Sequence, residues 1–198
     1  MAKVLWHVTM SLDGFIAGPG DGMDWVLESL EPAPEPNPVV EEVIQTTGAM
    51  LAGRRSYDVA AREDQGAYGG AWTGPQFVLT HEPPKEPPED PLITFLTGDV
   101  REAVATALAA AGGKNVVVAG ADVARQCLEE GLVDEILVHI VPVLLGDGVR
   151  FYENAGAERV TLEPLTVART GRLTNLRFRV VGSPGYREER LWVELSGT

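Results

Sequence analysis

The sequence predicts an α/β fold in which a central, mostly parallel sheet has helices on both faces and antiparallel strands at its C-terminal end. Two observations lead to this prediction. Over roughly the first two thirds of the chain, short apolar runs alternate with segments that have helix signals, and such alternation is typical of a parallel sheet. The last third instead holds two extended runs joined by a short turn at Gly171 and Arg172, which is the pattern of an antiparallel hairpin.

Five stretches are predicted to be buried strands because they are short, rich in valine, isoleucine and leucine, and bounded by residues that break regular structure. They span residues 3–9, 49–53, 76–80, 115–119 and 135–143. The hairpin adds strands at 160–170 and 174–181. Ligands bind beyond the carboxyl ends of parallel strands, so the turns that follow these strands are the first places to look for a site.

Three segments have the signals of a helix N-terminus. Asn37 before Pro38 predicts a capping residue followed by the first helical turn. Asp99 precedes an alanine-rich stretch, 100–111, that two glycines end. Residues 121–130 carry an apolar stripe at helical spacing. These segments supply the helices that the two faces of the sheet require.

One domain is predicted for residues 1–181, which is enough chain for a sizeable hydrophobic core. Residues 182–198 are predicted to be a C-terminal tail, in which 190–195 alternates well enough to form one more edge strand. No internal repeat is present.

Composition excludes several classes of function. The chain has 198 residues, 16 Lys+Arg against 29 Asp+Glu, and a net charge of −13, which repels nucleic acid. Its apolar runs are too short to span a bilayer, and its N-terminus has no signal core. A single cysteine, Cys127, excludes an intrachain disulfide, and with only three histidines the composition argues against a zinc site. We therefore expect a cytoplasmic protein that binds a small molecule and neither nucleic acid, membrane nor metal.

The turn after the fourth strand is suited to an anion. Gly120 lies between two alanines and opens the helix that contains Asp122, so free N–H groups at the helix start can face a phosphate. The spacing matches neither a dinucleotide fingerprint nor a Walker loop, and Asp122 repels an anion. A plain tight turn therefore remains an alternative.

Two other turns carry anion-binding side chains. Gly53 ends a strand, and Arg54, Arg55 and Ser56 begin the next helix; an arginine fork suits phosphate oxygens. The alternative is that the arginines pair with nearby carboxylates such as Asp58. The third turn ends in Thr80 and His81, which can donate to a phosphate or simply face solvent.

A glycine-rich loop follows the first strand and is a candidate substrate lid. It contains Asp13, and Asp24 follows beside Trp25. The alternatives are an Asx turn at Asp13 and a core tryptophan at Trp25. His7 and His139 lie inside predicted strands, and we interpret both as packing residues.

Four segments in this order resemble the dihydrofolate-reductase-like superfamily, most closely the C-terminal reductase domain of bifunctional riboflavin-biosynthesis deaminase–reductases and its stand-alone relatives. They are SLDGFIAG at 11–18, GRRSYD at 53–58, FVLTH at 77–81 and NVVVAGADVARQCLEEGLVDEILVHIVPVLLGDGVRFYE at 115–153. The resemblance covers essentially residues 4–181 and implies a dihydrofolate-reductase-like α/β fold. The zinc pattern of the deaminase half is absent from the sequence.

The resemblance also implies a function and a site. It implies an NADPH-dependent reductase of the 5-amino-6-(5-phosphoribosylamino)uracil reductase type, commonly a homodimer, acting on a small polar heterocycle or sugar-like substrate. Asp13 and Asp24 are the candidate catalytic proton donors, and Trp25 the candidate substrate-binding residue. The implied cofactor-binding residues are Thr9, Ile16, Ala17, Gly53, Arg54, Arg55, Ser56, Leu79, Thr80, His81, Gly120, Ala121, Asp122, Val123 and Ala124.

Two functions stay open at this point. The phosphate loop of the superfamily commonly has two or three consecutive glycines, whereas this chain has Gly120 alone between alanines. That departure favours a non-catalytic nucleotide- or partner-binding protein on the same scaffold. The retained turn at residues 53–56 favours the enzyme.

Overall fold

In the computed structural model of the chain, the structure describes residues 1–30, 37–62, 66–86, 88–153 and 159–182. Its strands are β1 (Val4–Ser11), β2 (Phe15–Ala17), β3 (Thr47–Gly53), β4 (Gln76–Leu79), β5 (Ile93–Leu96), β6 (Asn115–Ala119), β7 (Glu135–Val141), β8 (Val149–Arg150), β9 (Thr161–Thr170) and β10 (Leu173–Gly182). Its helices are α1 (Asp24–Leu30), α2 (Pro38–Thr46), α3 (Arg54–Arg62), α4 (Val100–Ala110) and α5 (Ala121–Glu129), with a short 3-10 turn η1 at Pro19–Asp21. None of these described helices is long and apolar enough to cross a membrane.

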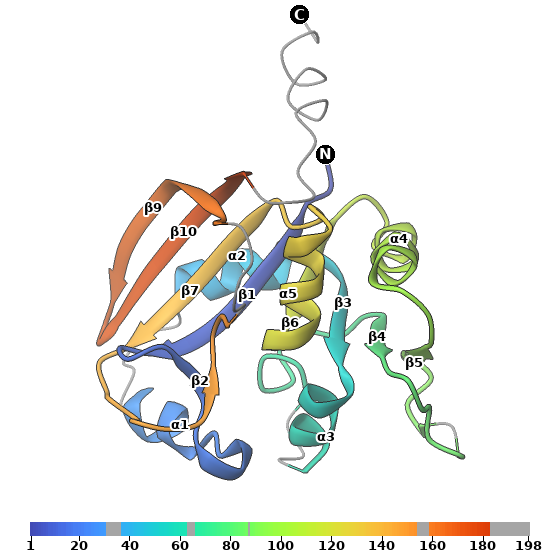
Figure 1. The fold of residues 1–198 in the computed structure, drawn as a ribbon, viewed down its shortest axis with the longest axis horizontal. Coiled ribbons are helices and arrows are strands. Elements are labelled where there is room, and N and C mark those ends of the chain that lie inside the picture. Colours follow the sequence, from blue (N-terminus) through green and yellow to red (C-terminus); the bar gives the residue numbers. More distant parts are fainter. Residues whose placement is uncertain (31–36, 63–65, 87, 154–158, 183–198) are drawn as a thin grey trace, which may run out of the picture.

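Eight strands form one sheet in the order β5-β4-β3-β6-β1-β7-β10-β9 (Figure 1). The six strands from β5 to β7 pair in parallel, whereas β10 is antiparallel to both β7 and β9. Strands β2 and β8 form a separate two-stranded sheet. The predicted α/β fold, with a mainly parallel sheet and an antiparallel C-terminal hairpin, is confirmed.

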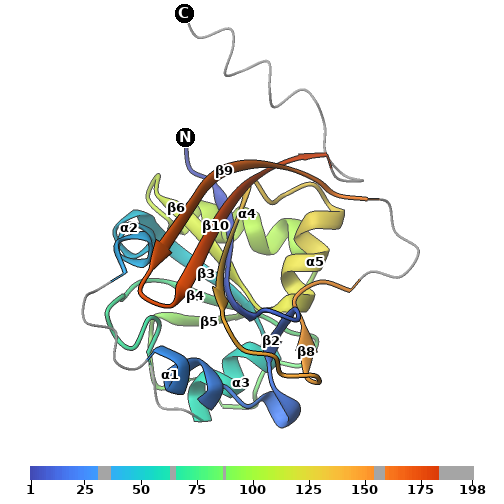
Figure 2. The same ribbon diagram turned by 90° about the vertical axis from the view of Figure 1, so that its left-hand side faces the viewer.

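Helices cover both faces of the sheet. Helices α4 and α5 lie on one side and α2 on the other, while α1 and α3 lie at one end of the sheet (Figure 2). Side chains of β1 alternate accordingly: Val4 and Trp6 pack into the cluster with α4 and α5, and Leu5 packs with Val43 of α2 and with Leu137. The core therefore has two layers, one on each side of the strands.

The capping residues identified in the sequence start their helices as expected. The Asn37 side chain accepts a hydrogen bond from the backbone N–H of Val39 at 3.0 Å, and the Asp99 side chain accepts one from Glu102 N–H at 2.9 Å. The C-terminal end of α4 packs so closely on β3 that a Cβ at Gly48 would lie 2.0 Å from the Ala111 carbonyl oxygen. A glycine is therefore required at that position.

Three short strands were not predicted. Strands β2 and β8 have three and two residues, which is too short for an apolar pattern to emerge, whereas β5 has four residues and directly follows a proline-rich segment. Strand β1 also runs on to Ser11, and β7 ends at Val141 rather than at residue 143. The extra strand expected at 190–195 lies outside the described residues.

Candidate functional site

A cavity of about 940 Å³ opens at the edge where the parallel strands end. Its wall comes from the ends of β1, β3, β4 and β6, the first turns of α3 and α5, and parts of β2 and α1. Of the residues that the resemblance implies for a cofactor, the wall contains Thr9, Ile16, Ala17, Gly53, Arg54, Arg55, Ser56, Leu79, Thr80, His81, Gly120, Ala121, Asp122 and Val123. Ala124 does not line it, because its side chain is fully buried in the core beneath α5.

The turns that open α3 and α5 touch each other. Gly120 has a φ of +88°, and a Cβ built there would lie 2.3 Å from the Ser56 hydroxyl oxygen. The same two turns also meet at Gly53, where a Cβ would lie 3.2 Å from a methyl group of Val123. Both glycines let the two helix starts approach, and the left-handed backbone at Gly120 excludes other residues in any case.

The turn after β4 closes the third side. Arg54 Nη1 and the Thr80 hydroxyl both donate to the carbonyl oxygen of Glu82, at 3.3 and 3.2 Å. His81 lies close enough to Asp122 to help lower the pKa of that carboxyl, although the hydrogen bond from Arg125 is the main cause. The three turns identified in the sequence are thus mutual neighbours around one space.

Both arginines of the α3 turn already have carboxylate partners. Arg54 Nε donates to Asp58 Oδ1 at 2.8 Å, which is the pairing considered as the alternative from sequence. Arg55 Nε donates to Asp21 Oδ1 at 2.7 Å, and this bond is the main reason that the pKa of Asp21 is lowered. Exposed ion pairs of this kind are worth at most about 1 kcal/mol. A phosphate group can therefore displace either carboxylate at small cost.

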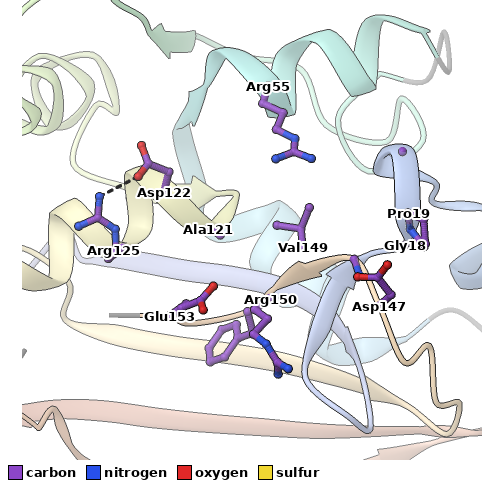
Figure 3. A pocket seen from close by; sticks show the side chains of 13 residues that line it. Gly18, Pro19, Arg55, Ala121, Asp122, Arg125, Asp147, Val149, Arg150 and Glu153 are labelled. Carbon is purple, nitrogen blue, oxygen red and sulfur yellow. Dashed lines mark hydrogen bonds and ion pairs between the residues drawn. The ribbon is translucent and has the colours of Figure 1, made fainter. Parts of the chain in front are cut away.

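A second cavity, of about 550 Å³, adjoins the first around the N-terminus of α5. Figure 3 shows Arg55 pointing into it, opposite Val149, while Asp122 and Arg125 pair on α5. Gly148 lies beside β2, where a Cβ would be 2.1 Å from the Ala17 carbonyl oxygen. Because the two cavities share Arg55 and the α5 start, one extended ligand can occupy both.

Asp13, predicted as the first catalytic candidate, does not line either cavity. Its carboxylate accepts hydrogen bonds from the Ser11 hydroxyl at 2.6 Å and from the backbone N–H groups of Leu145 and Gly146 at 3.0 and 2.7 Å. The Ser11 bond is the main reason that the pKa of Asp13 falls to about 2. The geometry is that of a turn-stabilising residue, and the role of Asp13 as a proton donor stays a prediction.

Asp24 and Trp25 also lie outside the cavity wall. Asp24 is exposed at the first position of α1, where a carboxylate favours the helix dipole. Trp25 donates from its indole N–H to the Gly22 carbonyl at 3.2 Å. From this segment the wall instead receives the apolar side chains of Met23 and Val26, together with Asp21, the partner of Arg55.

The sequence reasoning missed a buried polar chain, which we define as Tyr68, His7, His139 and Asn175. The Tyr68 hydroxyl lies 2.8 Å from His7 Nδ1, the two Nε2 atoms of His7 and His139 are 2.6 Å apart, and His139 Nδ1 lies 2.5 Å from Asn175 Oδ1. Tyr68 and His7 line the cavity. Burial, His139 and Arg177 lower the pKa of His7 to about 3. The histidines are therefore more than packing residues. Their contact depends on the parallel register of β1 and β7, which pairs Thr9 with His139 and so places His7, two residues before Thr9, on the same face of the sheet.

Known proteins share this architecture. A crystal structure of a putative riboflavin biosynthesis protein from Shewanella sp. PV-4 superposes with a TM-score of 0.78 at 21% identity, over 91% of this chain and 99% of that one. A deaminase/5-amino-6-(5-phosphoribosylamino)uracil reductase from Thermotoga maritima gives 0.63 at 15% identity, over 91% of this chain and 57% of that one. These likenesses establish the fold.

Sequence comparison is more specific. Uncharacterized protein YwjB of Bacillus subtilis (strain 168) is 25% identical over 157 residues, which are 76% of this chain and 82% of that protein. The family model of the RibD C-terminal domain matches residues 2–175. That match spans nearly the whole described chain, including every turn of the cavity, and the protein therefore belongs to the RibD C-terminal domain family.

Proposed function

We propose that this chain is an NADPH-dependent reductase of the riboflavin-biosynthesis type, which transfers a hydride to a small polar heterocycle, such as a substituted uracil, or to a sugar-like substrate. One observation supports the proposal above all: three turns with anion-binding groups converge on one cavity at the carboxyl edge of the sheet. A dinucleotide carries phosphates at several points along its length, and a cavity with three such turns suits it.

The start of α5 fits the pyrophosphate. Gly120 occupies the capping position and has no side chain that could accept a hydrogen bond from the first turn. The N–H groups of that turn therefore remain available to an anion. The contact between Gly120 and Ser56 brings a hydroxyl donor beside them. Residues 120–123 and Ser56 are therefore the groups that would hold the pyrophosphate.

The opposite side fits the 2′-phosphate that distinguishes NADPH from NADH. Arg54 and Thr80 meet at the Glu82 carbonyl, and His81 lies beside them in the chain. Arg54 offers a guanidinium from α3, and Thr80 and His81 offer a hydroxyl and an imidazole from the turn after β4; arginine binds phosphate through two parallel hydrogen bonds.

The β1 end fits the nicotinamide and the substrate. Thr9, Ile16 and Ala17 line the cavity there, joined by Met23 and Val26 of the α1 segment. When bound, NADPH supplies the hydride. The apolar side chains exclude water and orient the reacting groups, which is the main contribution a protein makes to such a transfer.

A non-catalytic nucleotide-binding protein is the second candidate. The observation that favours it is that Arg54 and Arg55 are both ion-paired within the chain, with Asp58 and Asp21. A binding protein that has lost its chemistry retains the cradle and shows no turnover, so activity separates the two candidates.

Titration with NADPH and NADH, followed by tryptophan fluorescence, tests the proposal. We expect saturable binding with at least a tenfold preference for NADPH, because a bidentate arginine–phosphate contact is worth more than about 1.4 kcal/mol. Arg54→Ala should abolish the preference. Arg101→Ala is the matched control, because Arg101 pairs with Glu130 on the α4–α5 side and lines neither cavity. Absence of binding to either nucleotide would overturn the proposal; binding without NADPH oxidation across a substrate screen would favour the second candidate.

We also propose a homodimer formed through the β9 edge. Strand β9 is ten residues long and mostly exposed, with Leu162, Leu165 and Val167 all on its surface. Unprotected edges of this length attract another strand or surface. Light scattering of the wild type and of Val167→Lys tests it: the wild type should be a dimer and the variant a monomer, and a monomeric wild type would contradict it.

A further inference from the structure

The polar chain of Tyr68, His7, His139 and Asn175 has a direction that can be worked out from its far end. The starting point is the backbone N–H of Val39, which can only donate. It donates to Asn37 Oδ1 at 3.0 Å, as the cap of α2. The Asn37 amide is thereby oriented, because its oxygen faces the helix and its Nδ2 group, a donor, faces Asn175.

A ring of three side chains then orients Asn175. Its Oδ1 accepts from Asn37 Nδ2 at 3.2 Å, and its own Nδ2 donates to the Thr170 hydroxyl at 3.1 Å. The Thr170 hydroxyl donates in turn to Asn37 Oδ1 at 3.3 Å. Reversing the Asn175 amide would place two donors against each other, so its oxygen is the atom that faces His139.

The orientation passes through both imidazoles, since a neutral histidine has one donor and one acceptor nitrogen. Asn175 Oδ1 lies 2.5 Å from His139 Nδ1, which must therefore donate, and His139 Nε2 becomes an acceptor. His7 Nε2, 2.6 Å away, must then donate, which leaves His7 Nδ1 as an acceptor for the Tyr68 hydroxyl at 2.8 Å. Burial lowers the pKa of both histidines, so the neutral forms that this argument needs are the ones present near neutral pH.

The Tyr68 hydroxyl ends the chain at the cavity. Its proton is directed to His7, and within the described part of the chain His7 is its one hydrogen-bond partner. Burial raises the pKa of the Tyr68 hydroxyl above its usual value, so the hydroxyl keeps that proton. Only its lone pairs remain for a ligand, in a wall that also contains the apolar side chain of Met50.

We propose that this chain makes the Tyr68 hydroxyl an obligatory hydrogen-bond acceptor in the cavity wall, and that the site selects a substrate carrying an N–H or O–H group at that point. The inference rests on the proposed function for the existence of a substrate and names its chemical class: a neutral donor such as a ring N–H of a uracil. A carbonyl or phosphate oxygen in the same place would face lone pairs and be rejected. Tyr68 is the binding residue, while His7, His139 and Asn175 are positioning residues.

The direction of the chain is read by long-range ¹H–¹⁵N NMR of the imidazole nitrogens in the protein without ligand. The chain has three histidines. The variant His81→Gln, at a residue outside the polar chain, removes one set of imidazole signals, and His139→Gln then identifies which of the other two sets belongs to His139. We expect opposite tautomers: His7 protonated at Nε2 and His139 at Nδ1. Identical tautomers, or His7 protonated at Nδ1, would overturn the proposal.

Asn37→Asp reverses the chain while keeping the cap, because aspartate also caps helices well. The new carboxylate cannot donate to Asn175, so the Asn175 amide should turn and present Nδ2 to His139. Both histidines should then change tautomer, so that His7 is protonated at Nδ1 and His139 at Nε2. The Tyr68 hydroxyl would then be free to donate its proton to a ligand in the cavity. Unchanged tautomers in this variant would show that the cap does not set the direction.

Uracil and 1,3-dimethyluracil, which lacks both ring N–H groups, test the acceptor in the NADPH-loaded protein by calorimetry. We expect uracil to bind about tenfold more tightly to the wild type, and the ratio to fall to about one in Tyr68→Phe and in Asn37→Asp. Equal binding to the wild type, or no binding of uracil, would overturn the ligand assignment. The NMR experiment needs neither nucleotide nor turnover, so a failure of the reductase proposal is distinguishable from a failure of this one.

Discussion

The two faces of the sheet use the same strands in different ways. Towards α4 and α5, β1 and β7 present only apolar side chains, such as Trp6 and Ile136, which pack into the larger core cluster. Towards α2, the alternate residues of the same strands include His7, Glu135 and His139, all hydrogen-bonded. One face is a hydrophobic core, and the other is an apolar patch surrounded by a polar network.

The difference follows from how much each face is covered. Among the described helices, α4 and α5 cover the first face and α2 lies on the second (Figure 2). Where the strands do not pack against Val43 of α2, their side chains on this face are polar and form hydrogen bonds with one another, as buried polar groups must. Part of that network extends to the cavity wall at His7 and Tyr68. The less covered face therefore contributes polar side chains to the site, whereas the other face contributes apolar ones such as Val8 and Val123.

The largest effect is expected on the apolar face. Trp6 is fully buried and stacks on Phe151 with ring centroids 4.2 Å apart, so Trp6→Ala should lower the free energy of unfolding by about 3–5 kcal/mol. Trp6→Phe is the control: among the described residues the Trp6 indole N–H has no hydrogen-bond partner, so its loss should cost much less. Denaturant unfolding measures both, and equal losses would contradict a core held by packing alone.

A smaller and pH-dependent effect is expected on the polar face. The buried Glu135 carboxylate accepts from Lys3 Nζ at 2.5 Å and from Arg177 Nε at 2.7 Å. Burial opposes its ionisation, but these two cations outweigh burial and lower its pKa. Glu135→Gln should cost about 2–3 kcal/mol at pH 7, since it breaks a largely buried ion pair.

The sign of the pH dependence follows from the lowered pKa of Glu135. The stabilisation is complete above the unfolded-state pKa of about 4.3 and is lost as the pH falls through the lower folded-state value. The stability difference between the wild type and Glu135→Gln should therefore shrink in acid. A difference that stays constant down to pH 2 would mean that the charge of Glu135 is not what matters.

Much of the architecture can be predicted from local sequence patterns, but the hydrogen-bonded network on the polar face cannot. The caps at Asn37 and Asp99 are visible in the sequence because each acts on residues two or three positions away. The contact between His7 and His139 joins residues 132 apart, and it depends on a strand register that no local pattern specifies.

The residues of the site also differ in whether a local sequence pattern predicts them. The turns at Gly53 and Gly120 were found because glycine at a strand-to-helix turn is a local requirement. The hydrogen-bond partners of Asp13, Leu145 and Gly146, could not be predicted because they lie far along the chain. Tyr68 gave no local signal at all.

Two capping residues allow the faces to be compared directly. Asp99→Ala removes the cap of α4, on the apolar face, and should cost about 1 kcal/mol. Asn37→Ala removes the cap of α2 and also the support of Asn175, so it should cost about 1 kcal/mol more. Thermal unfolding of both variants measures the difference, and equal costs would show that the polar chain adds no stability.

The smallest effect is expected at Asp13. Asp13→Asn keeps an oxygen acceptor for the Leu145 and Gly146 N–H groups, so NADPH oxidation with a competent substrate should change by less than about threefold. Loss of a true general acid costs about 10²–10⁴-fold. A loss of that size, with binding of NADPH unchanged, would identify Asp13 as the proton donor.

A crystal structure with NADPH bound tests the central claim, which is that the three turns form one nucleotide site. We expect the pyrophosphate at the first turn of α5 and the 2′-phosphate beside Arg54 and Thr80, with Arg54 released from Asp58. A nucleotide bound away from these turns, or crystals that take up none at saturating NADPH, would contradict it.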